Sequence, residues 1–226
     1  AGRRQIDSVT SRTLAATGRL SRCGSTTTIN VYHDHADVGN RLGFREPRRG
    51  SLGGVMRFAL VDRIVSLERG ESISTVKNLS LAEEYLADHF PGFPVLPGVL
   101  MLEALVQSGA WLMRDAEDFR YSTILLKQAK ALKFNNFVTP GRTLCVTVAV
   151  HKKEDQDWIF KARGTVDDVS AVSARITLGQ FNLSDQDPSL ADADQRTIDH
   201  MRSLFGQLWQ PDTQAAAPET VAKASQ

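Results

Sequence analysis

Several features that would mark a particular class of protein are scarce in this chain of 226 residues. The two cysteines, Cys23 and Cys145, lie far apart and form no CxxC pair, which argues against a disulfide framework or a zinc ribbon and favours a reducing compartment. The formal net charge is +1, so no strong overall field indicates a nucleic-acid or membrane partner. No apolar run is long and uninterrupted enough for a convincing membrane span. We therefore expect a globular, cytoplasmic protein.

The charges are unevenly distributed along the chain. Residues 1–54 hold nine arginines, no lysine and four acidic residues, whereas the rest holds 18 basic and 22 acidic residues. An Arg-rich, acid-poor leader is typical of an organelle transit peptide. A disordered extension, or upstream sequence included through a misplaced start, fits as well, because the first methionine is Met56 and the apolar residues before it show no period. We expect residues 1–55 to be a disordered extension.

Regular hydrophobic patterning begins after Met56 and predicts one domain over residues 56–183. Segments with strand-like patterning are 57–67, 72–79, 121–134, 144–151, 158–166 and 171–181. The longest apolar block, 98–113, is apolar on nearly all sides and predicts a buried helix. Glu103 and Gln107 are four residues apart and share one face of that helix. A long helix lying on one antiparallel sheet is an α+β arrangement.

The patterning of the domain stops at Leu183. Residues 184–194 form a polar, acidic linker, and residues 210–226 have the composition of a disordered tail. Between them, residues 195–209 place apolar side chains at helical spacing and predict an amphipathic helix. Such a helix could dock on the core or on a partner.

The segment that leads into the buried helix carries the candidate chemistry. Its three prolines make a stiff loop that can hold His89 in place. The loop ends where unpaired N–H groups of a helix start collect, and these can stabilise negative charge on a carbonyl oxygen. Burial should raise the pKa of Glu103, so that it could act as a general acid beside a histidine base. The alternative is that His89 only makes hydrogen bonds within its loop and that Glu103 only has a structural partner. The spacing of these residues alone does not identify a reaction.

The string from 89 to 107, HFPGFPVLPGVLMLEALVQ, resembles the signature of the FabZ-type 3-hydroxyacyl-acyl-carrier-protein dehydratases. The flanking strings LVDRIVSLERGESISTVKNLS and KQAKALKFNNFVTPGRTLCVTV are similar to strands of the same family. The resemblance covers residues 56–183. It implies the hot-dog fold, in which a curved antiparallel sheet wraps a long central helix. It also implies dimers that pair through their sheets and commonly assemble as trimers of dimers.

The resemblance assigns roles to residues that match the signature. His89 matches the catalytic histidine and Glu103 the catalytic carboxylate, and in the family these two meet across the dimer interface. Gly98 matches the glycine whose backbone N–H binds the thioester carbonyl, and Gln107 matches a position that supports the carboxylate. The expected substrate-contacting residues are Gly98, Val99, Gln107 and Phe93.

The implied reaction is the reversible dehydration of a (3R)-3-hydroxyacyl thioester to the trans-2-enoyl thioester. The implied partner is an acyl carrier protein. The reaction needs neither a metal nor a redox cofactor, because the thioester carbonyl makes the proton on C2 acidic. One alternative is a hot-dog thioesterase, which would use a carboxylate on the same helix to activate water. The other is a non-catalytic module that binds acyl carriers, against which the intact His89 and Glu103 argue.

Overall fold

The computed structural model describes residues 27–30, 58–87, 89–90 and 92–211. The expected disordered tail lies outside the described residues from 212 onward. Of the expected extension at 1–55, only residues 27–30 are among those described. None of the helices in these described ranges is long and apolar enough to cross a membrane.

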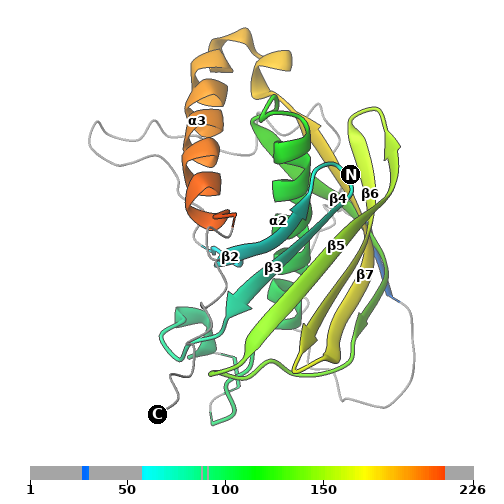
Figure 1. Cartoon of the computed structure of the whole chain (residues 1–226), viewed down its shortest axis with the longest axis vertical. Helices are drawn as coiled ribbons and strands as arrows, with labels where there is room; N and C mark the ends of the chain where they lie inside the picture. The colour runs from blue at the N-terminus through cyan, green and yellow to red at the C-terminus, as the bar shows by residue number, and fades with distance from the viewer. Residues whose placement is uncertain (1–26, 31–57, 88, 91, 212–226) are drawn as a thin grey trace, which may run out of the picture.

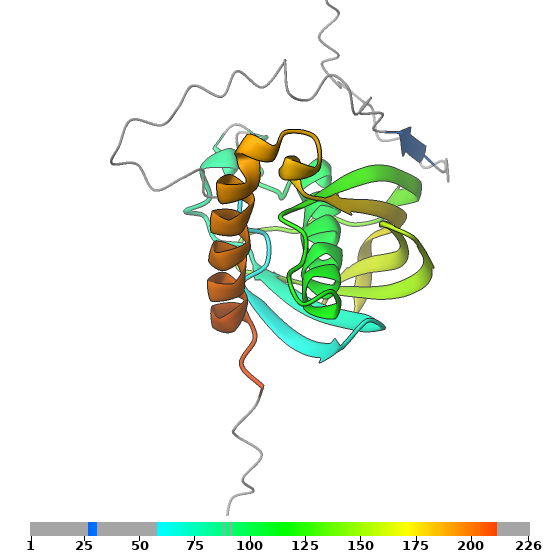
Figure 2. The same ribbon diagram turned by 90° about the horizontal axis from the view of Figure 1, so that it is seen from above.

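One antiparallel sheet, strongly curved, accounts for all the strands. They are β1 (Thr27–Asn30), β2 (Arg63–Glu68), β3 (Ser72–Asn78), β4 (Thr123–Phe134), β5 (Thr143–Glu154), β6 (Asp157–Val166) and β7 (Val169–Phe181). Their order across the sheet is β1-β4-β7-β6-β5-β3-β2. Helix α2 (Gly98–Ala116) lies inside the curve of the sheet, and helix α3 (Ala191–Leu208) lies on the other side of α2 (Figures 1 and 2). The predicted α+β hot-dog arrangement is confirmed.

The strands form because apolar and polar side chains alternate along them. In β6, Trp158 and Phe160 are buried, while Lys161 between Phe160 and Ala162 is exposed. The inward side chains pack on α2, whose middle is buried on every side. Gly109 permits this close approach, because a Cβ there would lie 3.0 Å from Cδ1 of Leu178. Enclosure of α2 therefore sets the shape of the domain.

Strand β1 lies within the segment expected to be disordered. It pairs antiparallel with β4, and Ile29 is the partner of Ala129. A strand of four residues is too short to show a hydrophobic period in the sequence. The sequence pattern therefore does not predict it.

The helix expected at 195–209 is α3, and it docks on the core. Its Phe205 contacts Trp111 of α2 and Phe119 at ring-centroid distances of 6.1 Å and 5.4 Å. The start of the helix is held by Asp194, which is 5% exposed. Its carboxylate accepts hydrogen bonds from the Ser122 hydroxyl and from the backbone N–H groups of residues 183 and 184.

Replacing Asp194 by alanine is expected to loosen α3. The change leaves three donors without their acceptor and should lower the free energy of unfolding by about 2 kcal/mol, measured by chemical denaturation.

Burial acts to raise the pKa of Asp194, but the hydrogen bonds outweigh it and the net pKa is lowered. The stabilisation is thus present near neutral pH and is lost as the pH falls through the folded-state pKa. Asp192→Ala, on the exposed face of the same turn, is the control and should change little. Equal effects of the two changes would contradict this role.

Candidate active site

His89 lies in the loop before α2, and its imidazole is held by the backbone of the same loop. The ring Nδ1 lies 3.0 Å from the carbonyl oxygen of Val95. Since a carbonyl oxygen can only accept, Nδ1 carries the proton in this contact and the neutral ring leaves a lone pair on Nε2. Val95 and Leu96 are fully buried, and the N–H of Leu96 donates to the carbonyl of Val138 at 2.8 Å. The histidine is therefore anchored to the core through its loop.

The loop itself adopts a tight backbone path. Phe90 has a φ of 63° and Gly92 has a φ of 89°, and the N–H of Phe93 donates to the carbonyl of Phe90 at 2.8 Å. A bulky residue at positive φ is uncommon and is kept there only when its surroundings require it. The ring of Phe90 lies against His89, with centroids 4.4 Å apart. This conformation limits the positions that the imidazole can occupy.

Helix α2 begins beside this histidine. Pro97 precedes the first turn, and its carbonyl accepts hydrogen bonds from Leu100 and Met101 at 2.9 Å and 3.1 Å. Within the described residues, no acceptor is found for the N–H groups of Gly98 and Val99. A helix start with free N–H groups and the positive end of the dipole favours negative charge nearby.

A cavity of about 370 Å³ adjoins both the histidine and the helix start. Its lining residues are His89, Val95, Leu96, Gly98, Met101, Phe134, Asn135, Asn136 and Phe137. Phe134 sits directly over Gly98, where a Cβ would lie 3.2 Å from the Cε1 atom of that ring. Phe93 contacts the lining residue Phe137 edge to face, with centroids 5.9 Å apart. The cavity is therefore a largely aromatic and aliphatic space with one imidazole in its wall.

Glu103 and Gln107 form a second cluster, one and a half turns into α2. The Gln107 amide nitrogen donates to Oε1 of Glu103 at 3.0 Å and to the carbonyl of Phe58 at 2.9 Å. Its amide oxygen accepts from the N–H of Leu60 at 2.9 Å. Gln107 thus joins the glutamate to the segment that leads into β2. Burial raises the pKa of Glu103 and the bond from Gln107 lowers it in part, so the net pKa lies above that of an exposed glutamate.

The expected site residues therefore separate into groups within one protomer. His89 and Gly98 share the cavity, with Phe93 beside its rim. Glu103 and Gln107 pair with each other and are not among the residues that line this cavity. Val99 is 69% exposed and points away from the core.

The end of β4 contributes to the site in a way that the sequence does not predict. Phe134, Phe137 and the two asparagines between them line the cavity although they follow His89 by more than forty positions. The sequence predicts that the string KFNNF forms the end of a strand and the turn after it. A cluster of aromatic residues next to two amides was the available signal, but nothing in it indicated which loop the cluster would face.

Replacing Gln107 by leucine is expected to affect both stability and the glutamate. The change leaves the N–H of Leu60 and the carbonyl of Phe58 without partners and should lower the free energy of unfolding by about 2 kcal/mol. It also removes the donor that favours ionised Glu103, so the pKa of Glu103 should rise further, as measured by carbon-13 NMR titration of its carboxyl group. Gln207→Leu on an exposed face of α3 is the control. An unchanged or lowered Glu103 pKa would contradict this account.

Comparison with known proteins identifies the family. The FabA-like domain family matches residues 54–175, more than half of the chain. The chain is 41% identical over 118 residues to the 3-hydroxyacyl-[acyl-carrier-protein] dehydratase FabZ of Latilactobacillus sakei subsp. sakei, covering 52% of this chain and 84% of the relative. It is 40% identical over 123 residues to the FabZ of Albidiferax ferrireducens, and the match covers 53% of this chain and 82% of that relative. Among solved structures, the dehydratase heterocomplex ApeI:P from Xenorhabdus doucetiae is similar with a TM-score of 0.49 at 14% identity, covering 59% of this chain and 90% of that one. The chain belongs to the FabA-like domain family and, within it, to the FabZ-type dehydratases.

Proposed function

We propose that the protein catalyses the reversible dehydration of a (3R)-3-hydroxyacyl-acyl-carrier-protein to the trans-2-enoyl-acyl-carrier-protein in fatty-acid synthesis. The observation that carries the proposal is the contact of His89 Nδ1 with the Val95 carbonyl, at the wall of the apolar cavity. This contact leaves Nε2 as a base, and the start of α2 lies beside it. The relatives named above are dehydratases of this type.

In the proposed reaction, Nε2 of His89 takes the proton from C2 of the acyl thioester. The N–H of Gly98 binds the thioester carbonyl oxygen, where negative charge develops. The electron pair of the C2–H bond forms the C2–C3 double bond as the C3–O bond breaks. Glu103 supplies a proton to the departing hydroxyl, which leaves as water. The raised pKa of Glu103 favours the protonated form that this step needs.

We infer that the Glu103 used in each cavity comes from a second copy of the chain. Glu103 is not among the residues that line the His89 cavity of its own protomer. Large apolar side chains are also exposed around that cavity: Phe90, Phe93, Val99, Phe134 and Phe137. Apolar patches of this kind favour coverage by another protein surface. A two-fold dimer would cover both patches at once and form two shared sites, and three such dimers would make the assembly implied by the family resemblance.

The cavity also bears on the substrate. Its lining is apolar apart from His89 and the two asparagines, which suits an acyl chain rather than a polar or charged substrate. An acyl carrier protein is the proposed donor of the chain, because the relatives named above are dehydratases of 3-hydroxyacyl-acyl-carrier-proteins.

The first test follows hydration of a short trans-2-enoyl thioester by the full chain. His89→Ala and Glu103→Gln should each lower the rate between about a hundredfold and ten-thousandfold, since each removes one acid–base group. His200→Ala and Glu154→Gln, which are exposed and far in the sequence from His89 and Glu103, are the matched controls. Loss of the enoyl absorbance without release of thiol is expected. Thiol release would instead indicate the thioesterase alternative.

The second test examines whether the site is shared. The two inactive variants, each carrying a different tag, are co-expressed and the resulting mixture of dimers is assayed. If each site takes one residue from each copy, half of the randomly formed dimers are mixed and each has one intact site, giving about a quarter of the wild-type rate. Capture through both tags shows whether mixed dimers are present. If they are present and the mixture is as inactive as the two parent variants, the shared site is refuted.

The third test uses pH. A general acid must be protonated, so the rate of dehydration should fall as the pH rises through the pKa of Glu103. Because Gln107 lowers that pKa, Gln107→Leu should move the alkaline limb of the profile to higher pH. Gln207→Leu should leave the limb in place. A shift to lower pH would contradict the role of Glu103 as the acid.

A further inference from the structure

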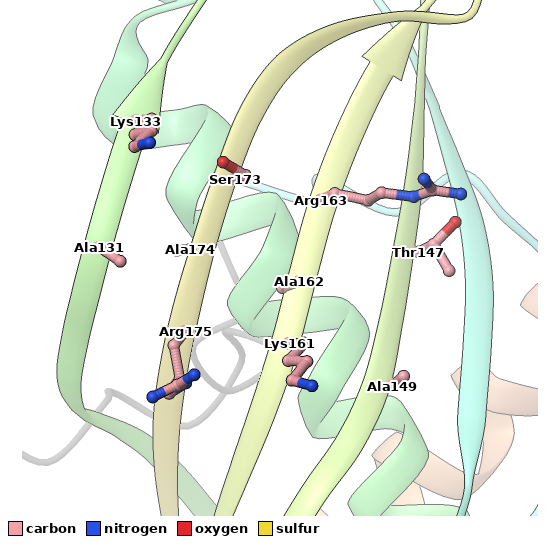
Figure 3. Close-up of a pocket in the computed structure, with 10 residues that line it drawn as sticks. All are labelled: Ala131, Lys133, Thr147, Ala149, Lys161, Ala162, Arg163, Ser173, Ala174 and Arg175. Carbon is pink, nitrogen blue, oxygen red and sulfur yellow. The ribbon is translucent and has the colours of Figure 1, made fainter. Parts of the chain in front are cut away.

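The outer face of the sheet, on the side away from α2, carries a basic groove. Four cationic side chains project from three neighbouring strands at the positions where the strand pattern points outward: Lys133 of β4, Lys161 and Arg163 of β6, and Arg175 of β7 (Figure 3). They border a shallow depression of about 510 Å³. Its remaining lining residues are Ala131, Thr147, Ala149, Ala162, Ser173 and Ala174. We call this surface the basic groove.

The positive charge of the basic groove is not neutralised within the described part of the protomer. Lys161 lies directly opposite Arg175 in the β6–β7 pair, and like charges in that position destabilise a sheet. None of the four cations forms an ion pair with a described residue. Some lysines elsewhere in the sheet do form ion pairs, as Lys127 of β4 does with Asp157 and Lys152 of β5 does with Glu154. An anionic group from outside would therefore relieve repulsion that the fold leaves in place.

The floor of the groove restricts the kind of anion. Its small side chains are mostly alanines, and no aromatic ring is present among its lining residues. Binding of single-stranded nucleic acid relies on aromatic rings on which bases stack. A shallow floor of methyl groups bordered by cations instead suits a protein surface that carries carboxylates next to small or aliphatic side chains.

The same chain offers such a surface around the start of α3. Residues 184–194 contain four aspartates and no lysine or arginine. Asp185, Asp187 and Asp192 are exposed there, next to the partly exposed apolar side chain of Leu190. Ser189 donates two hydrogen bonds to Asp187, from its hydroxyl and its backbone N–H, which fix the carboxylate and lower its pKa. We call this surface the acidic shoulder.

The basic groove and the acidic shoulder cannot meet within one protomer. The groove lies on the outer face of β4 to β7, whereas α3 lies beyond α2 on the opposite side of the sheet (Figure 2). The sheet and α2 stand between them. The shoulder also lies outside residues 54–175, the part of the chain that matches the FabA-like domain family.

We propose that the basic groove binds the acidic shoulder of a second copy of this chain. The contact joins two different surfaces, so it can continue from copy to copy and close into a ring or extend into a chain. It is separate from the two-fold dimer proposed above, which covers the apolar patch at the His89 cavity. Dimers that form through that patch would be linked to one another through the groove.

Charge reversal on each side tests the contact in the full chain. One variant combines Lys161→Glu with Arg175→Glu, and the other combines Asp187→Lys with Asp192→Lys. By sedimentation equilibrium, each should raise the dissociation constant of the assembly beyond the dimer about tenfold or more, and the wild-type assembly should weaken at high salt. Mixing the two variants should restore the assembly, because reversed charges again face each other.

Further measurements separate this result from misfolding and from failure of the proposed reaction. Arg120→Glu with Arg142→Glu makes the same change of charge elsewhere on the surface and should leave the assembly intact. Circular dichroism and enoyl-thioester hydration by the dimer should be unchanged in all variants, since no altered residue lines the His89 cavity. If the assembly dissociates in the groove variant but not in the shoulder variant, the proposal is overturned. The groove would then bind another anionic partner. Failure of the mixed variants to reassemble, or no dependence on salt, would also overturn it.

Discussion

Enclosure of α2 is the constraint on which the rest of the structure depends. The helix is apolar on nearly all sides, so exposure of any face would cost hydrophobic free energy. The curved sheet covers one side, and α3 with the segment before β2 covers the other (Figures 1 and 2). The first turn is left partly open at one end of the helix. The cavity beside His89 lies at that open end because it is where the covering elements stop.

Polar groups on such a helix must find partners within the fold, and this requirement connects stability with chemistry. Gln107 uses its amide oxygen and nitrogen to hold the backbone of residues 58 and 60, and the same nitrogen bonds Glu103. One arrangement thus partly buries the glutamate, gives it a hydrogen bond and raises its pKa. A carboxyl group whose pKa is raised, and which is therefore more readily protonated, follows from the packing of the helix.

The two faces of the sheet serve different purposes because the pleat sends neighbouring side chains to opposite sides. The inward set builds the core around α2, and Trp158, Phe160 and Leu178 are examples. The outward set is free of that demand and can carry charge. In this chain the outward positions of β4, β6 and β7 bring cations together without local partners. The proposed self-association uses the face that the hydrophobic core does not need.

The sequence by itself determined the elements whose signal is local. Strand-like patterning located six of the seven strands in the described part of the chain, the apolar block located α2, and the string from 89 to 107 pointed to His89, Gly98 and Glu103. Only the tertiary structure revealed the cavity wall at Phe134 and Phe137, the bonds from Gln107 to residues far earlier in the chain, and the basic groove. Each of these depends on strand register and loop path. Those are decided by which distant segments pack together, whereas a hydrophobic period records only which side of its own element each residue occupies.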